Sequence, residues 1–306
     1  MSDANDRLTR FLIDRAGVRG VHVRLDDAWA RVRANMRATG ERAPAALELL
    51  GEALAAAALF TGHTKVDGRL AVQLRTPGAL RTLFAECTAS GTVRGIVRVD
   101  PDAGAVPRNP AEFGEGSVLA ITIENPPAPG RRDPVRYQGL VGLQADSLAG
   151  AFEDYFRQSE QLPTRLLLAT DGDRVAGLML QKLPGDEGDE DGWNRSSALF
   201  DTLPGTELLE VPASLLLTRL FHEDGVQLLG GRDLEFGCSC STGRVEAMLV
   251  SLGEDEAIAA TRASGTPGVA EITCEFCGER YHIDEERLRR LLDADAAGVD
   301  APGRVQ

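Results

Sequence analysis

The sequence predicts an α+β protein with a mixed sheet-and-helix N-terminal domain, a helical linker and a small C-terminal module built around cysteines. Strand-like runs follow one another with few helices between them up to residue 184, which argues against a parallel doubly wound sheet. After Pro184 the composition changes abruptly, and four of the five cysteines then fall in two close pairs. We therefore divide the chain into residues 1–184, 185–235 and 236–306.

The N-terminal domain begins with two short strands and a helix. Residues 11–13 and 21–25 have strand character, the second because apolar and polar side chains alternate along it. Asp26 or Asp27 is placed to cap a helix that runs to about Met36, because a carboxylate at a helix start accepts hydrogen bonds from free amides.

Two further helices are expected in this domain. Pro44 suits the first turn of a helix that Gly62 is placed to end. Residues 45–60 are apolar on nearly every face, so we expect this helix to be buried. Residues 147–161 form a third predicted helix, with large apolar side chains along one side.

Seven further strand-like runs are bounded by turn dipeptides or by loops rich in proline and glycine, as in sheets built from hairpins. These runs are residues 69–75, 80–88, 93–99, 118–124, 135–143, 164–170 and 175–183. Together they make the N-terminal domain rich in sheet.

The linker is first acidic and then apolar. Residues 185–192 carry five acids and no apolar side chain, which is typical of a solvated loop rather than a metal site. Residues 193–223 are helical in character and rich in leucine and phenylalanine. Such a segment is too apolar to remain solvated, so we expect it to dock on the N-terminal domain in the resting state.

The C-terminal module is predicted to be helical around its cysteines. Residues 242–252 and 254–263 have the pattern of two short helices separated at Gly253. Residues 284–292 form a final predicted helix, and residues 294–306 have the character of a frayed tail.

The two cysteine pairs are Cys238-Ser-Cys240 and Cys274-Glu-Phe-Cys277, and Gly278 follows the second. Residues two apart on an extended chain point to the same side, so the first pair can present both sulfurs to one ion. The second pair has the turn chemistry of a zinc knuckle, in which a glycine with positive φ lets backbone amides face the sulfurs. Four sulfurs complete a closed tetrahedral zinc site without an open catalytic position.

The size of the module supports a metal, because units below roughly 70–80 residues usually need a staple and structural zinc supplies about 10–16 kcal/mol. Spacing alone favours a purely structural zinc ribbon over a switch. One feature shifts this balance: a disulfide across the single residue between Cys238 and Cys240 is geometrically tight, and strained disulfides tend to be labile and regulatory. Oxidation can therefore convert four thiolates into two local disulfides and release the ion.

Other reactive residues give weaker signals. Cys87 stands alone in a predicted strand, where a buried structural side chain is expected. His282 follows the second pair, but four sulfurs already complete the shell, so we expect it to pack beside Tyr281. His222-Glu223 lacks the second histidine of a metalloprotease helix, and the chain has no nucleophile elbow, phosphate-binding loop or dinucleotide fingerprint. The sequence carries no enzyme signature.

Charge and hydropathy restrict the partners and the compartment. The formal net charge is −14, which disfavours binding to nucleic acid or to an anionic membrane surface. The longest apolar run, residues 53–60, is far short of the roughly 20 residues that span a bilayer. The acidic start lacks a secretory pattern. We therefore expect a cytoplasmic protein whose paired cysteines serve metal or redox chemistry.

Two other functions remain open at this point. A thiol–disulfide oxidoreductase would use Cys274 and Cys277, but this pair does not open a helix after a strand as in redox βαβ units. A constitutive zinc-ribbon binding module for nucleic acid is disfavoured because the C-terminal segment is itself acidic.

Five stretches in order carry a family resemblance that spans nearly the whole chain. They are LFAECT at 83–88, YFRQSEQLPT at 155–164, GLMLQKLP at 177–184, LTRLFHE at 217–223 and EITCEFCGERYH at 271–282. With the cysteine pattern, they make the chain similar to the bacterial redox-regulated holdase chaperones, the 33 kDa chaperonin family of heat-shock proteins. The gap between the cysteine pairs, residues 241–273, is slightly longer than we expect for this family, and its first residues, 241–243, replace a more charged stretch. Neither departure touches a ligand.

The resemblance implies a client-binding core domain, a metastable linker and a zinc-binding redox-switch module. It also implies that the reduced, zinc-bound protein is inactive, and that oxidation forms the disulfides Cys238–Cys240 and Cys274–Cys277 and releases the zinc ion. The module and then the linker would unfold, and the exposed surfaces would bind unfolding or oxidatively damaged proteins without ATP. The activated form would be a homodimer, and the chain would have no catalytic residue.

Overall fold

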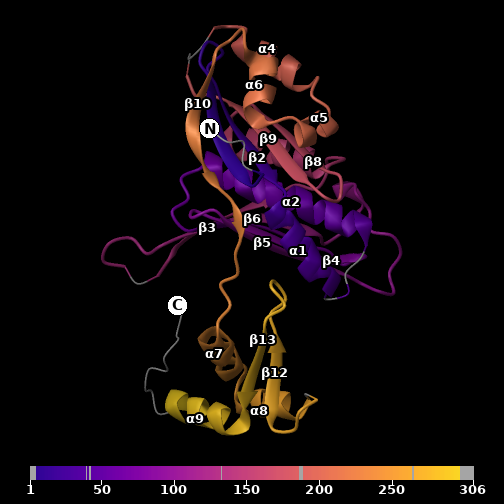
Figure 1. Ribbon diagram of the computed structural model, residues 1–306, viewed down its shortest axis with the longest axis vertical. Helices are drawn as coiled ribbons and strands as arrows, with labels where there is room; N and C mark the ends of the chain where they lie inside the picture. Colours follow the sequence, from indigo (N-terminus) through magenta and orange to yellow (C-terminus); the bar gives the residue numbers. More distant parts are fainter. Residues whose placement is uncertain are drawn as a thin grey trace. The chain divides into compact units, whose positions relative to one another are not determined.

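The computed structural model describes residues 5–38, 40, 43–131, 133–185, 189–263 and 265–296. The chain divides into two compact units, Met1–Gly237 (unit 1) and Cys238–Gln306 (unit 2). Unit 1 contains two sheets with helices packed against them, and unit 2 contains a β-hairpin with short helices (Figure 1). The predicted α+β class is confirmed.

A buried helix, α2 (Pro44–His63), forms the centre of unit 1 and begins at the predicted proline. It contacts strands of both sheets, and its leucines and alanines are almost wholly buried. Among the described residues it is the one helix long and apolar enough to cross a membrane, but 78% of its apolar window is buried inside the protein. It is a core helix, as its uniform hydropathy predicts.

The first sheet has five antiparallel strands, namely β1 (Arg7–Ile13), β2 (Val18–Leu25), β8 (Thr164–Thr170), β9 (Val175–Lys182) and β10 (Val226–Asp233). Their order is β10-β1-β2-β9-β8, so β2 lies at the centre. Side chains alternate between the two faces: Val175 and Met179 of β9 join the core around α2, whereas Leu178 and Leu180 join a second core. Both faces are therefore covered.

The second sheet also packs against α2, and most of its strands follow that helix directly in the chain. Its strands are β3 (Arg69–Arg75), β4 (Leu80–Thr88), β5 (Thr92–Val99), β6 (Val118–Asn125), β7 (Val135–Val141) and β11 (Glu235–Phe236). They run in the order β11-β5-β4-β3-β6-β7, and β11 is parallel to β5. Cys87 lies in β4 with no exposed surface, and burial raises the pKa of its thiol to about 11. The predicted burial of this cysteine is confirmed.

The helix α1 (Asp27–Ala38) lies where the sequence predicts it, but the hydrogen-bond acceptor for its first backbone amides comes from a different part of the chain. The carboxylate of Asp6 accepts hydrogen bonds from the backbone amides of residues 26, 27 and 28 at 2.9–3.0 Å. The carboxylate of Asp26 instead pairs with Arg24 at 3.1 Å. The predicted capping carboxylate was therefore wrong, because strand pairing brings a more distant acid to the helix start.

The helix predicted over residues 147–161 is present in two parts. Ser147 caps α3 (Leu148–Tyr155), and a single π-helical turn, Phe156–Glu160, continues it. Gln161 ends the turn with φ at 56°, a left-handed conformation that is uncommon outside glycine. The buried face predicted for this helix is confirmed, since Leu148, Phe152 and Phe156 all join the core around α2.

The apolar linker folds into three short helices, α4 (Gly192–Phe200), α5 (Gly205–Glu210) and α6 (Ala213–Phe221). Their buried side chains form a second core with the outer face of the first sheet, including Leu208, Leu216 and Phe221 of the linker and Phe11 and Leu178 of the sheet. The expectation that this segment docks on the N-terminal domain is confirmed. Of the acidic run before it, residues 186–188 lie outside the described part of the chain.

The longest element of unit 1 without a counterpart in the sequence-based assignment is a strand. Residues 226–233, at the end of the segment assigned as a helical linker, form the edge strand β10 beside β1. The stretch contains Gly230 and Gly231 and leaves Leu228 and Leu229 exposed, so it has no alternating pattern to detect. Its extended state is imposed by pairing with a neighbour more than 200 residues away in sequence.

Unit 2 contains α7 (Thr242–Leu252), α8 (Glu254–Ala263), the hairpin strands β12 (Val269–Thr273) and β13 (Arg280–Asp284), and α9 (Glu285–Ala296). The first two helices agree with the prediction residue for residue, and Gly253 lies between them with φ at 93°. Of the predicted tail, residues 294–296 are the end of α9 and 297–306 lie outside the described residues.

Candidate metal centre

The four cysteines of unit 2 converge on one point. The sulfurs of Cys238, Cys240, Cys274 and Cys277 all lie within 4.8 Å of one another. Two close contacts join the pairs to each other: Cys238 Sγ is 3.6 Å from Cys274 Sγ, and Cys240 Sγ is 3.3 Å from Cys277 Sγ. All four side chains are partly buried and none is in a disulfide. This is the cluster that the spacing predicts.

The second pair is held in the tight turn that joins β12 to β13. The Cys274 amide donates to the carbonyl of Glu279, and the Gly278 amide donates to the carbonyl of Cys274, both at 2.8 Å. Gly278 has φ at 75°, which confirms the predicted left-handed glycine. Because this pair lies in a hairpin turn and not at a helix start, it lacks the setting that activates a thioredoxin-like cysteine.

The first pair is held by the start of α7. The Ser241 hydroxyl accepts a hydrogen bond from the Arg244 amide and so caps the helix. The Arg244 guanidinium donates to the carbonyl of Ser239, between the two cysteines, at 2.7 Å. One arginine therefore fixes the chain between Cys238 and Cys240, a role that sequence spacing did not suggest.

Electrostatics in the cluster favour a cation. Burial, together with the neighbouring cysteines, raises the pKa of Cys277, even though the Glu279 amide lowers it. Burial likewise raises the pKa of Cys240. For Cys238 the effect of burial is outweighed by hydrogen bonds from the Cys240 amide and from neighbouring thiols, which lower its pKa. Four thiolates at this spacing repel one another, and a bound metal ion is the physical means of offsetting that repulsion.

The donor set fits one metal ion. Four sulfur ligands from two short loops match the closed sites of metals that prefer soft thiolates, and they leave no position for a substrate. The apolar cluster of unit 2 is small, with seven buried residues and no buried aromatic ring among those described: Val245, Leu249, Ala257, Ile258, Ala270, Ile283 and Leu288. A core of this size usually needs a bound metal ion or a disulfide to remain stably folded.

Tyr281 is a further site residue that the sequence analysis did not identify as functional. It lies on β13 opposite Ile272, and its hydroxyl hydrogen-bonds the sulfur of Cys240. That bond raises the pKa of Tyr281, so the hydroxyl stays protonated and serves as a donor to the sulfur. His282 lies beside it on the same strand and is not among the clustered residues. A tyrosine four residues after the last cysteine is the only sequence signal that could have indicated this contact.

Replacing Tyr281 with phenylalanine should weaken metal binding by about tenfold, because outer hydrogen bonds to metal ligands typically contribute about 10–100-fold to affinity. The ring remains, so the hairpin should still fold. Competition with a chromogenic chelator measures the effect. Tyr137→Phe makes the same chemical change in unit 1, which does not contain the four clustered cysteines, and should leave the affinity unchanged. Equal affinities in all three proteins would show that the Tyr281 hydroxyl does not support the site.

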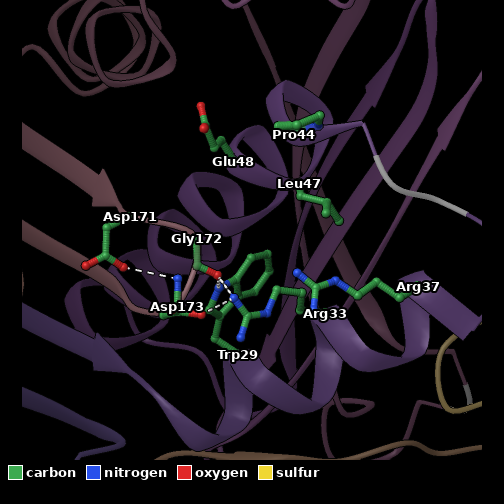
Figure 2. Close-up of a pocket in the computed structure, with 9 residues that line it drawn as sticks. All are labelled: Trp29, Arg33, Arg37, Pro44, Leu47, Glu48, Asp171, Gly172 and Asp173. Carbon is green, nitrogen blue, oxygen red and sulfur yellow. Dashed lines mark hydrogen bonds and ion pairs between the residues drawn. The ribbon is translucent and has the colours of Figure 1, made fainter.

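Unit 1 offers a separate cleft of about 580 Å³ between α1, α2 and the β8–β9 turn (Figure 2). The carbonyl of Gly172 accepts hydrogen bonds from the Trp29 indole, at 3.2 Å, and from Arg33. Arg33 also pairs with Asp173 at 2.5 Å. The polar groups at this turn therefore bind one another, and we assign the cleft no ligand.

Comparison with known proteins identifies the family. The family model described as Hsp33 protein matches residues 6–284. The 33 kDa chaperonin of Chromobacterium violaceum is 38% identical over 301 residues, which cover 98% of each chain. The 33 kDa chaperonin of Azotobacter vinelandii is 40% identical over 314 residues, covering 99% of this chain and 100% of that one. These matches extend over both units.

A solved structure supports the same fold. The crystal structure of the 33 kDa chaperonin from Thermotoga maritima matches with a TM-score of 0.74, covering 96% of this chain and all of that one, at 21% identity. Its similarity bears on the fold, whereas the sequence matches show the family. The relatives are chaperonins, which are not enzymes. The chain belongs to the Hsp33 family of 33 kDa chaperonins.

Proposed function

We propose that this chaperone is a redox-regulated, ATP-independent holdase that binds unfolding proteins during oxidative stress. The observation that carries the proposal is the cluster of four thiols in a small unit. Only Gly237 separates the first residue of that unit from the end of β11. The same chain, further back, is the apolar linker docked on the first sheet. A chemical change at the sulfurs can therefore act on the linker through direct chain connection.

The metal is proposed to be one Zn²⁺ ion per chain, held by Cys238, Cys240, Cys274 and Cys277. Tetrahedral zinc with Zn–S bonds near ~2.3 Å places its sulfurs about 3.8 Å apart. The sulfur separations of 3.3 and 3.6 Å, in a cluster whose sulfurs all lie within 4.8 Å of one another, are consistent with that geometry. Bound zinc would stabilise the folded module, whose own core is small.

Oxidation removes the ligands. Two molecules of peroxide take up four electrons from the four thiolates and, with four protons, yield two disulfides and four waters. We propose that the pairs are Cys238–Cys240 and Cys274–Cys277, although close sulfur contacts of 3.6 and 3.3 Å in the folded module also join Cys238 to Cys274 and Cys240 to Cys277. Once the module loses its metal and its fold, closing a local loop costs less chain entropy than closing one across residues 241–273.

Loss of the module would then release the linker. The linker helices bury Leu208, Leu216 and Phe221 against the sheet, so their release uncovers apolar surface on both partners. Unfolded proteins expose apolar side chains and would bind there. The acidic run at residues 186–191 would help to keep the opened state soluble. We further propose that the activated form is a homodimer, that the protein acts in the cytoplasm, and that bound clients refold only after it releases them.

The test is to treat the zinc-loaded protein with peroxide at mildly raised temperature. One zinc ion per chain should be released, and suppression of the aggregation of an unfolded test protein should begin, measured by a chelating dye and by light scattering. Reductant with zinc should reverse both. Peptide mapping by mass spectrometry should find the two local disulfides. Equal suppression by the reduced, zinc-loaded protein would refute the redox switch, and a Cys238–Cys274 disulfide would refute the pairing.

A further inference from the structure

The strand β10 covers one edge of the first sheet. It runs antiparallel to β1 along all of that strand, starting with Arg7 opposite Asp233. Figure 1 shows β10 as the long orange strand beside the N-terminal strands. The pairing extends past both ends, because the Leu234 amide donates to the carbonyl of Asp6 and the Asp14 amide donates to the carbonyl of Gly225, at 3.0 and 3.1 Å. The outer edge of β1 is therefore fully occupied by a segment of the linker.

The middle of β10 contributes little to its attachment through side chains. Leu228 and Leu229 are 42% and 53% exposed. The next two residues are Gly230 and Gly231, and a side chain at Gly231 would collide with the backbone carbonyl of Leu8. The ends of the strand add three side-chain contacts to the backbone hydrogen bonds: Val226 packs against the second core, Arg232 donates to the carbonyl of Ala89, and Arg7 pairs with the exposed Asp233 at 2.6 Å. Backbone bonds of this kind are available to any extended chain, whatever its sequence.

The strand β1 is anchored independently of β10. Its other edge pairs with β2 along its whole length. Leu8 is buried in the core around α2, while Phe11 and Ile13 are buried in the second core. When β10 leaves, β1 would stay in the sheet and present a row of unpaired amides and carbonyls, which is a template for another strand.

From this arrangement we propose that the outer edge of β1 is a strand-addition site for extended segments of unfolded proteins, and that β10 occupies it in the resting state. The inference rests on the proposed function, since it requires release of the linker. In strand addition, main-chain hydrogen bonds supply affinity and alternate side chains supply preference. An added strand would place every second side chain beside the apolar face formed by Phe11, Leu178 and Leu180, which favours segments with alternating apolar residues.

Hydrogen exchange tests the backbone pairing directly. In the resting protein the amides of residues 7–13 should be protected on both edges. In the oxidised protein without client, exchange in this peptide should accelerate by about tenfold or more, because half of its amides lose their partners. Addition of an unfolded client should restore the protection. Binding through apolar side chains alone would leave these amides exchanging at the fast rate.

A covalent lock provides the functional test. Arg7→Cys with Asp233→Cys, joined as a disulfide in the zinc-loaded protein and verified by mass mapping, holds β10 on β1 after activation. Arg7→Cys with Arg24→Cys is the matched control, because Arg24 pairs with Arg7 across the β1–β2 ladder and leaves β10 free. The first protein should need about tenfold more chain for half-suppression of aggregation, and the control should match the parent protein. Protease sensitivity of residues 192–221 checks that the linker opens in both.

The outcomes separate this inference from the proposed function. If the parent protein neither releases zinc nor suppresses aggregation, the redox switch fails and the strand-addition site loses its premise. If the parent protein is active and the locked protein is equally active, clients do not use the edge and the inference is overturned. If the β1 amides are already protected in an oxidised dimer before client is added, a second copy of the chain occupies the edge, which also overturns the assignment to clients.

Discussion

Replacing Cys277 with serine should abolish stable metal binding and unfold residues 238–296 while leaving unit 1 folded. Three sulfurs and a weakly coordinating hydroxyl cannot complete the closed shell, and structural zinc of this type contributes about 10–16 kcal/mol. The seven-residue core of unit 2 cannot offset a loss of that size. Metal content by atomic spectroscopy and amide exchange across the two units measure the result.

The fifth cysteine supplies the control for this prediction. Cys87 is fully buried in β4 and is not part of the cluster, so Cys87→Ala should retain one metal ion per chain and a protected unit 2. A Cys277→Ser protein that still bound metal with parental affinity, or that kept slow exchange in residues 238–296, would show that the four sulfurs do not act together.

Replacing Leu216 with alanine should release the linker without any oxidant. Leu216 is completely buried between α6 and the first sheet, and a leucine-to-alanine change at such a site costs about 2–5 kcal/mol. The linker helices are short and are held to the sheet by this core and by partly exposed ion pairs such as Arg165–Asp201, so a loss of that size should shift them toward the undocked state. We expect the reduced, zinc-loaded variant to suppress client aggregation, measured by light scattering.

The adjacent residue is a matched control on the same helix. Leu215 is 45% exposed, so Leu215→Ala makes the same chemical change with little loss of burial. It should remain inactive until oxidised, and both variants should keep a full complement of zinc. If the two alanine variants behaved alike, docking of the linker would not be what restrains the chaperone.

Elements whose signals are local were predictable from the sequence. The proline and the uniform hydropathy of residues 44–63 define α2, and alternation with flanking turns defines β3, β4 and β8 to the residue. The metal cluster belongs to the same class, because each cysteine pair is a short local motif. Only the convergence of the two pairs on one point required the fold, and four thiols in a small unit made that convergence the expected result.

What could not be predicted depends on pairing between distant segments. Asp6 caps α1 only because β1 lies beside β2, which brings its carboxylate to the helix start. The strand β10 has no sequence pattern of its own and is extended because β1 offers it partners. Tyr281 reaches Cys240 only after the β12–β13 hairpin has formed. In each case the deciding interaction joins residues that no local window contains.

The burial of Cys87 has a consequence for the stoichiometry of the proposed oxidation. A thiol with a pKa of about 11 and no exposed surface is almost wholly protonated at neutral pH and is out of reach of dissolved oxidants. Cys87, the fifth cysteine, therefore does not take part in the proposed oxidation. Under the proposed mechanism, oxidation would then take electrons in pairs from unit 2 alone, and Cys87, the one thiol of unit 1, would be too buried to link two copies or to trap a client covalently.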